Sequence, residues 1–235
     1  FPYFVNANGV HFLHGRALPL ATGISLTRPD LHVFAFGGDG DAFAIGGNHL
    51  DHTARRNINM TYVIMDNFIY GLTKAQTSPT SPLGFKSKTD PAGNMDVPVN
   101  PIKKLLTSGA TFIARGITYD QPHLMSLMER ALDHEGFSVV EVLSECTEFN
   151  RGSFDGASPR RGGAMKIIDE KTHDVTNEAA AYALAGDPFP GWFGVFYQVQ
   201  RPTRNRREAD LIKASGGAGK PDALGQLQKY FSRLK

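Results

Sequence analysis

The sequence predicts an α/β fold with a mainly parallel sheet and helices on both of its faces. Two apolar runs, at residues 33–36 and 62–65, are short and end in small or acidic residues, which is typical of buried strands in a parallel sheet. The stretch between them, residues 44–56, is predicted to be their crossover helix. Further apolar runs at 110–114 and 137–143 predict two more strands.

The helices follow from apolar spacing and from residues that favour helix starts. Residues 17–26 have the spacing of a buried helix. Asn100 and Pro101 predict the start of a short helix, because Asn is a favoured cap and Pro a favoured first residue. Asp120 caps a longer helix with an apolar stripe. Before the helix that starts at Asn100, residues 81–100 are rich in Gly and Pro and lack periodicity, so we expect a long functional or flexible loop there.

We divide the chain into an α/β domain at residues 1–146 and a C-terminal extension at 147–235. The extension is expected to pack on that domain and on a partner subunit. It contains a predicted short helix at 177–185 and a predicted edge strand at 194–199. Its last part carries an amphipathic stripe suited to a subunit contact, formed by Leu224, Leu227, Tyr230, Phe231 and Leu234.

Composition narrows the class of protein. The 235 residues, 41% of them hydrophobic, suit one globular domain with a sizeable core. A formal net charge of +2 and the absence of a recognisable binding motif argue against a nucleic-acid partner. No apolar run approaches the roughly 20 residues of a membrane helix, so we expect no membrane partner. A single cysteine excludes an internal disulfide framework and fits a reducing cytoplasm.

Two loops that follow predicted strands have residues suited to a charged ligand. In the first, Gly37-Gly38-Asp39-Gly40-Asp41, the glycines allow close approach of the backbone, and Asp39 offers a carboxylate to a hard divalent cation. In the second, residues 66–73, the side-chain oxygen of Asn67 and the carbonyl of Ile69 could complete an oxygen-only ligand set.

Such a ligand set favours magnesium beside a diphosphate. Mg²⁺ usually takes few protein ligands and fills its octahedron with phosphate and water oxygens. Ligands of open parallel sheets gather where the strands end, and both loops lie at such ends. The sequence therefore predicts Mg²⁺ and a diphosphate at one edge of the sheet.

Longer strings in the same regions resemble a known family. HGRALPLATG at 14–23, GGDGDAFAIGG at 37–47 and DNFIYGLTKAQTSPTS at 66–81 resemble the β subunit of 2-oxoacid:ferredoxin oxidoreductases, particularly the 2-oxoglutarate type, over essentially the whole chain. The resemblance implies a thiamine diphosphate-binding fold in which Asp39, Asn67 and the carbonyl of Ile69 hold Mg²⁺ against the diphosphate.

The resemblance also implies roles for other residues. Lys74 would meet the distal carboxylate of the substrate, although lysines are most often simply exposed to solvent. His14 would lie beside the cofactor, the alternative being a histidine that caps a loop. The residues expected to contact thiamine diphosphate are His14, Gly38, Gly40, Asp41, Gly71, Leu72 and Thr73.

Cys146 lies where the family has its fourth cluster cysteine. The resemblance places Phe1 well inside the family subunit, whose front segment carries three further cysteines, and a [4Fe–4S] cluster needs four thiolates. We therefore expect a cluster only together with those missing N-terminal cysteines. From the residues alone, the alternatives are a small buried thiol, or a nucleophile with a distant histidine partner, which no nearby sequence supports.

The resemblance implies the activity of the assembled enzyme. It would oxidatively decarboxylate a 2-oxoacid, most simply 2-oxoglutarate, to acyl-CoA and CO₂, and pass the electrons to ferredoxin. The expected partners are an α subunit, ferredoxin, the 2-oxoacid and CoA, in a cytoplasmic α–β complex. Two alternatives stay open: a non-oxidative thiamine diphosphate decarboxylase or synthase, and a truncated non-catalytic scaffold subunit.

Overall fold

The computed structural model describes residues 4–214 and residue 232. All five residues of the predicted apolar stripe, from Leu224 to Leu234, lie outside these described residues. Among the described residues, no helix combines the length and the apolar character needed to cross a membrane.

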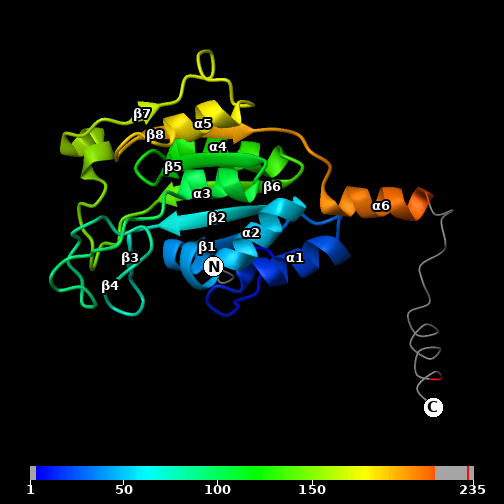
Figure 1. Ribbon diagram of the computed structural model, residues 1–235, viewed down its shortest axis with the longest axis horizontal. Coiled ribbons are helices and arrows are strands. Elements are labelled where there is room, and N and C mark those ends of the chain that lie inside the picture. The colour runs from blue at the N-terminus through cyan, green and yellow to red at the C-terminus, as the bar shows by residue number, and fades with distance from the viewer. Residues whose placement is uncertain (1–3, 215–231, 233–235) are drawn as a thin grey trace.

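The chain folds around a six-stranded sheet, as Figure 1 shows. Four adjacent strands, from one side of the sheet inward, run parallel to one another, and the strand next to them, β8, runs antiparallel to its neighbour β5. The order across the sheet is β1 (Phe34–Gly38), β2 (Met60–Asp66), β6 (Phe137–Leu143), β5 (Phe112–Ile117), β8 (Trp192–Gln198) and β7 (Lys166–Ile167). The prediction of a mainly parallel α/β fold is confirmed.

Helices cover both faces of this sheet. One face packs against four helices, α1 (Ala17–Thr27), α2 (Gly47–Arg56), α3 (Pro101–Ser108) and α5 (Glu178–Leu184), and the other packs against α4 (Gln121–Asp133). Strand residues alternate between the two cores: Tyr62 and Ile64 belong to the first and Val63 to the second. This alternation is the period-two pattern of a strand that is buried on both sides.

Local signals explain where the helices begin and end. The Asn100 side chain accepts a hydrogen bond from the Lys103 N–H at the start of α3, and Asp120 does the same for α4. Asn177 caps α5 in the same way. Helix α2 ends at Asn57, which adopts the left-handed conformation that Asn tolerates better than most residues.

Two expectations about strands were wrong. The run at 194–199 was expected to be an edge strand, but β8 pairs with β5 on one side and with the short β7 on the other. The run at 33–36 was expected to be fully buried, but β1 is the outer strand of the sheet and Phe34 is 38% exposed. Both strands are apolar, and an apolar run does not specify its position across a sheet.

Several shorter elements complete the chain. A π-helical turn at Asp41–Ile45 links β1 to α2, and two short 3₁₀ turns lie at Asp155–Ala157 and Pro159–Arg161. Strands β3 (Ile69–Tyr70) and β4 (Gln76–Thr77) form a separate antiparallel hairpin after β2. Helix α6 (Arg204–Ala214) projects from the opposite end of the sheet (Figure 1).

The strand register determines which loops meet. Gly38 at the end of β1 lies opposite Met65, and Asp66 at the end of β2 lies opposite Leu143 at the end of β6. The loops that follow these three strands therefore leave the same side of the sheet, which we call the carboxyl edge. In Figure 1 the arrowhead of β2 points toward the β3–β4 hairpin at this edge. The opposite side, where the parallel strands begin, is the amino edge.

Candidate cofactor site

Two buried carboxylates face one hydroxyl group at the carboxyl edge. Asp39 follows β1 and is 2% exposed, and Asp66 ends β2 and is fully buried. The Thr80 hydroxyl oxygen lies 2.8 Å from Asp39 Oδ2 and 2.8 Å from Asp66 Oδ1. The second oxygen of Asp66, Oδ2, is buried and has no hydrogen-bond partner. This edge of the sheet therefore concentrates acidic groups that the fold does not fully neutralise.

The pKa values of both carboxyl groups are raised. Burial raises the pKa of Asp39, although hydrogen bonds from Ser78, Thr80 and the Asn67 backbone oppose the shift. Burial raises the pKa of Asp66 well above its usual range, and the neighbouring charge of Asp39 raises it further. A cation beside these groups would offset the cost of burying their charge.

The second loop is a tightly held turn. The Asn67 side-chain oxygen accepts a hydrogen bond from the Ile69 N–H at 3.1 Å, which leaves that oxygen a second lone pair for another contact. Phe68 has a φ of 61°, in the left-handed region, and its carbonyl accepts a hydrogen bond from the Ser81 hydroxyl at 2.6 Å. Because Gly38 pairs with Met65 and Thr80 bridges Asp39 and Asp66, the loops that carry the two predicted ligand residues, Asp39 and Asn67, lie next to each other.

Gly40 lies directly against an aromatic ring of the second loop. A Cβ atom at this position would lie 2.0 Å from the Tyr70 ring, so no other residue fits here without moving Tyr70. At Gly38 the nearest atom to such a Cβ would be 3.7 Å away, which is ordinary contact. The first loop thus packs onto the second through Gly40, while Gly38 keeps the backbone uncovered.

Asp41 joins the first loop to the chain that precedes α1. Its carboxylate accepts hydrogen bonds from the Gly15 N–H and from the Tyr62 hydroxyl, the latter at 3.3 Å. It also lies 3.2 Å from Nδ1 of His14, whose side chain is 55% exposed and whose ring is 6.0 Å from that of Tyr70. These contacts place His14 at the carboxyl edge, and contact of His14 and Asp41 with a cofactor stays a prediction.

Three predicted site residues, Leu72, Thr73 and Lys74, lie at the tip of the β3–β4 hairpin. Leu72 is 98% exposed, and Thr73 and Lys74 are exposed as well. Thr73 is hydrogen-bonded to Gln76 through its hydroxyl and its carbonyl, which closes the hairpin. Gly71 lies at the base, close to the second loop. Leu72, Thr73 and Lys74 therefore extend away from the buried carboxylates, and their contacts with ligand stay predictions.

Cys146 lies beside the same loops. It follows β6, is partly buried, and its sulfur would be 3.4 Å from a Cβ atom on Gly71. A hollow of about 400 Å³ also adjoins the hairpin and is lined by residues that include Tyr70, Ser78 and Asn94. The described residues contain no group of three or more His, Cys, Asp or Glu side chains that could hold a metal. A metal held by Asp39 would therefore take its other ligands from amide and carbonyl oxygens and from oxygens of its ligand.

The residues present fit Mg²⁺ with a diphosphate. Asp39 supplies a buried carboxylate, Asn67 an amide oxygen with a lone pair to spare, and the unpartnered Oδ2 of Asp66 adds uncompensated negative charge nearby. These are hard oxygen donors of the type that Mg²⁺ prefers. The uncovered backbone at Gly38 allows a bulky anionic ligand to approach.

Sequence reasoning missed Asp66, Thr80 and Asn150 as parts of this site. Asp66 directly precedes Asn67 at a strand end, which is a usable signal for a buried acidic group. Thr80 and Asn150 reach the site through contacts that span 41 and 83 residues of the chain, respectively. No local pattern reveals such contacts.

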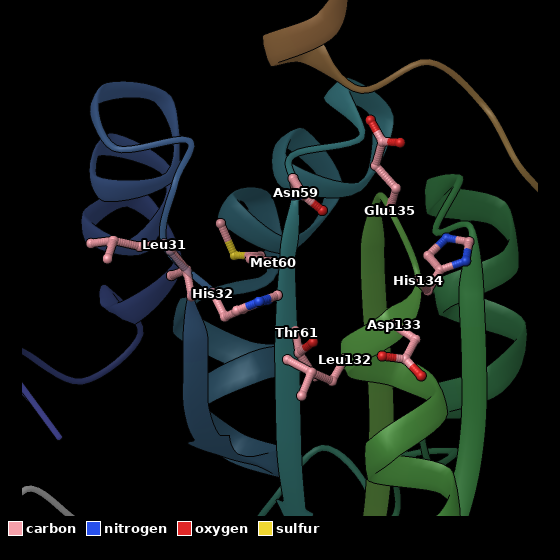
Figure 2. A pocket seen from close by; sticks show the side chains of 10 residues that line it. Leu31, His32, Asn59, Met60, Thr61, Leu132, Asp133, His134 and Glu135 are labelled. Carbon is pink, nitrogen blue, oxygen red and sulfur yellow. The ribbon is translucent and has the colours of Figure 1, made fainter. Parts of the chain in front are cut away.

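A second hollow, of about 150 Å³, lies at the amino edge (Figure 2). It is lined by ten residues, among them His32, Asn59 and Asp133. The Asn59 side-chain oxygen is already bonded to the Gly136 N–H at 3.0 Å. Ligands of open α/β sheets gather at the carboxyl ends of strands, so this hollow is not the candidate site.

Comparison with known proteins agrees with the geometry. Residues 2–142 match the family model described as thiamine pyrophosphate enzyme, C-terminal TPP binding domain. The chain is also similar to the solved structure of 2-oxoglutarate:ferredoxin oxidoreductase from Magnetococcus marinus, which holds 2-oxoglutarate, coenzyme A and succinyl-CoA. That similarity has a TM-score of 0.87 and 40% identity, and it covers 100% of this chain and 78% of that one.

Two curated relatives have comparable identity. The 2-oxoglutarate oxidoreductase subunit KorB of Mycobacterium tuberculosis is 46% identical over 74% of this chain and 46% of its own length. The 2-oxoacid:ferredoxin oxidoreductase subunit beta of a Sulfolobus species is 46% identical over 84% of this chain and 68% of its own length. The chain spans about half the length of several of the curated relatives that it matches. With the family model, the relatives and the fold in agreement, this chain belongs to the thiamine pyrophosphate enzymes and, among them, to the β subunits of 2-oxoacid:ferredoxin oxidoreductases.

Proposed function

We propose that this chain binds thiamine diphosphate with Mg²⁺ at the carboxyl edge, as the β subunit of a 2-oxoglutarate:ferredoxin oxidoreductase. One observation carries the proposal: at the ends of two adjacent parallel strands, the Thr80 hydroxyl lies 2.8 Å from both buried carboxylates, Asp39 and Asp66, and Asn67 directly follows Asp66. Asp39, Asn67 and the carbonyl of Ile69 would hold the metal. When bound, thiamine diphosphate supplies an electron sink for loss of CO₂ from a 2-oxoacid.

The chain's own residues would bind and orient this cofactor. Thr80 holds the Asp39 carboxylate in place, and Asp41 holds His14 and Gly15 next to the first loop. The glycines at 38 and 40 let the backbone lie close to a diphosphate and to Tyr70, respectively. Burial of the two carboxylates keeps water away from the metal side of the site.

Substrates and partners are proposed from the relatives. The M. marinus enzyme was solved with 2-oxoglutarate, coenzyme A and succinyl-CoA, which supports a 2-oxoacid substrate and CoA as acyl acceptor. The Sulfolobus relative is named as the β subunit of a 2-oxoacid:ferredoxin oxidoreductase, which supports an α subunit and ferredoxin as partners. Electrons would leave through a [4Fe–4S] cluster that takes Cys146 as one ligand, the other three thiolates coming from outside this sequence.

The test removes the two proposed ligand side chains separately. Asp39→Ala and Asn67→Ala should each weaken Mg²⁺-dependent thiamine diphosphate binding by more than about a hundredfold, since each loses a contact to a charged metal complex. Calorimetric titration in the complete natural subunit, assembled with its α subunit, measures this loss. Circular dichroism should stay nearly unchanged, because removing one of two crowded buried carboxylates also relieves repulsion.

Matched controls exist on the same fold. Asp133→Ala removes an exposed carboxylate at the amino edge, and Asn48→Ala removes an exposed amide on α2. Both should bind cofactor like the parent protein. Wild-type affinity in either Asp39→Ala or Asn67→Ala would refute the proposed metal site.

A further inference from the structure

The chain that follows β6 closes onto the second loop. The Asn150 N–H donates to the Cys146 carbonyl at 3.0 Å, and the two residues form an isolated β-bridge. We call residues 146–150 the clamp turn. From this turn the Asn150 side-chain amide donates to the main-chain carbonyl of Asn67 at 3.0 Å. A residue of the C-terminal extension thus holds the peptide that carries a proposed metal ligand.

The next part of the extension holds the same loop from another side. Phe154, which is fully buried, packs edge-on against Phe68 with ring centroids 4.8 Å apart, and Phe189 lies 5.9 Å from both rings. Phe68 has the left-handed backbone that bulky residues rarely adopt, with a φ of 61°. Such a conformation persists only when its surroundings hold it, and the aromatic packing does so.

The clamp turn is itself anchored. Glu145, just before it, accepts hydrogen bonds from the Gly152 N–H and from the Tyr119 hydroxyl, the latter at 2.6 Å. The Arg161 guanidinium lies 3.5 Å from the same carboxylate. The turn is therefore fixed to the sheet through Tyr119 after β5, so Asn150 is presented from a rigid support.

The turn also holds Cys146 near the loop it clamps. The Cys146 sulfur faces Gly71, the residue at the base of the hairpin, at a distance that would be 3.4 Å to a Cβ there. Asn150 and Cys146 are joined by a main-chain hydrogen bond. Movement of one end of the clamp turn would thus displace both the proposed cluster ligand and the Asn67 peptide.

We propose that Asn150 is a positioning residue for magnesium binding, acting through Asn67. This inference rests on the proposed function and assigns a task within it to the C-terminal extension. The peptide between Asn67 and Phe68 is held at both ends: its carbonyl accepts from Asn150, and its N–H, that of Phe68, donates to Asp66 Oδ1 at 3.1 Å. The Asn67 side-chain oxygen is then set toward the metal before the metal binds. Loss of the Asn150 amide removes one of the two hydrogen bonds that orient this peptide and leaves only the one to Asp66, so part of the free energy of metal binding must restore its orientation.

The experiment measures the Mg²⁺ concentration that gives half-maximal thiamine diphosphate binding. The complete natural subunit, assembled with its α subunit, is titrated with Mg²⁺ at fixed thiamine diphosphate and followed by calorimetry. Asn150→Ala should raise this concentration about fivefold, the effect of one lost hydrogen bond. Asn150→Asp keeps the shape but turns an acceptor toward the Asn67 carbonyl, so it should raise the concentration further. Saturating Mg²⁺ should restore thiamine diphosphate binding in both variants.

A matched control separates positioning from general stability. Asn177→Ala removes an asparagine that caps α5, so it should lower the melting temperature without changing the Mg²⁺ requirement. An unchanged Mg²⁺ requirement in both Asn150 variants would overturn the inference, as would an equal rise in Asn177→Ala. If the wild-type protein itself binds no thiamine diphosphate, the proposed function fails as well, and that result is distinct from either of these.

Discussion

The hydrogen-bond network around Asn57 at the amino edge differs from the pair of buried carboxylates at the carboxyl edge. At the amino edge, the Asn57 side-chain oxygen accepts hydrogen bonds from the Phe137 N–H at 2.8 Å and from the Thr111 hydroxyl at 2.9 Å, and its amide donates to the Arg201 carbonyl. Nε2 of His134 lies 2.9 Å from the same Thr111 oxygen. At the carboxyl edge, Asp66 keeps a buried oxygen without any partner.

The difference indicates which edge serves stability and which serves a ligand. The amino-edge network joins α2, β5, β6 and the chain before α6 through uncharged, paired groups, an arrangement that stabilises a fold. The carboxyl edge holds two neighbouring carboxylates, which destabilise a folded chain unless a cation or a proton accompanies them. Their presence in the core therefore indicates a role in binding a ligand rather than in stabilising the fold.

The largest expected effect is on stability, from the centre of the amino-edge network. Asn57→Ala should lower the free energy of unfolding by about 3–5 kcal/mol, because it leaves the Phe137 N–H and the Thr111 hydroxyl without their acceptor and puts Ala in a left-handed position. Asn57→Gly should lose somewhat less, since Gly adopts that backbone freely. Chemical denaturation followed by circular dichroism measures both values.

Thiamine diphosphate affinity in these two variants, measured below their melting temperatures, should match the parent protein. A large loss of affinity with intact stability would contradict the division between the two edges.

Local signals made much of this fold predictable. Strand β6 occupies the residues expected for it, and Asn100, Asp120 and Asn177 cap the helices predicted to follow them. These features depend on nearest neighbours along the chain. The order of the strands across the sheet does not depend on such local signals. The outer position of β1 and the interior position of β8 were therefore not predictable from two apolar runs.

The candidate site was predictable to a similar depth. Asp39 and Asn67 belong to short motifs at strand ends, and the structure places them side by side. Thr80 and Asn150 lie in stretches without periodicity, and only the folded chain brings them to the other two residues. The support around a site is built from such long-range contacts, so a single sequence shows the ligands more readily than what holds them.

A second, smaller effect should appear in the pH dependence of stability. His134 is 4% exposed, and burial lowers its pKa from 6.5 to about 4. Between pH 6.5 and 4, His134 is protonated in the unfolded chain but neutral in the folded chain. The free energy of unfolding therefore falls as the pH drops from 6.5 toward 4. Linkage gives a loss of about 2 kcal/mol at pH 5 relative to pH 7.

Comparing wild type with His134→Gln isolates this contribution from those of other titrating groups. The free energies of unfolding at pH 7 and pH 5 are measured for both proteins by urea denaturation. The wild-type protein should lose about 2 kcal/mol more than the variant over this interval. Equal losses of unfolding free energy in the two proteins would mean that folding does not lower the pKa of His134. His134 would then be protonated in the folded protein at pH 5, and the amino edge would hold a buried charge as the carboxyl edge does. Figure 2 shows this histidine on the connection from α4 to β6, beside the hollow at the amino edge.

The smallest expected effect belongs to Lys74, at the exposed tip of the carboxyl edge. Lys74 and Ala75 have φ values of 75° and 77°, a conformation that residues other than Gly rarely adopt. Two strained residues in succession at a hairpin tip point to a functional constraint, because Gly at either position would relieve the strain. The tip holds the lysine side chain outward, where a point charge suits the distal carboxylate of a 2-oxoacid.

Lys74→Ala should therefore lower kcat/KM for 2-oxoglutarate about five- to tenfold, the value of one charge-assisted contact at an exposed position, and leave pyruvate turnover almost unchanged. Lys74→Arg should recover most of the loss, since it keeps the positive charge. The measurement is reduction of methyl viologen by the assembled α–β enzyme with each 2-oxoacid. Equal losses on both substrates would mean that Lys74 supports the hairpin rather than contacting the substrate. A lower melting temperature in Lys74→Ala would also contradict the division between the two edges, because Lys74 would then stabilise the fold from the edge that we assign to ligand binding.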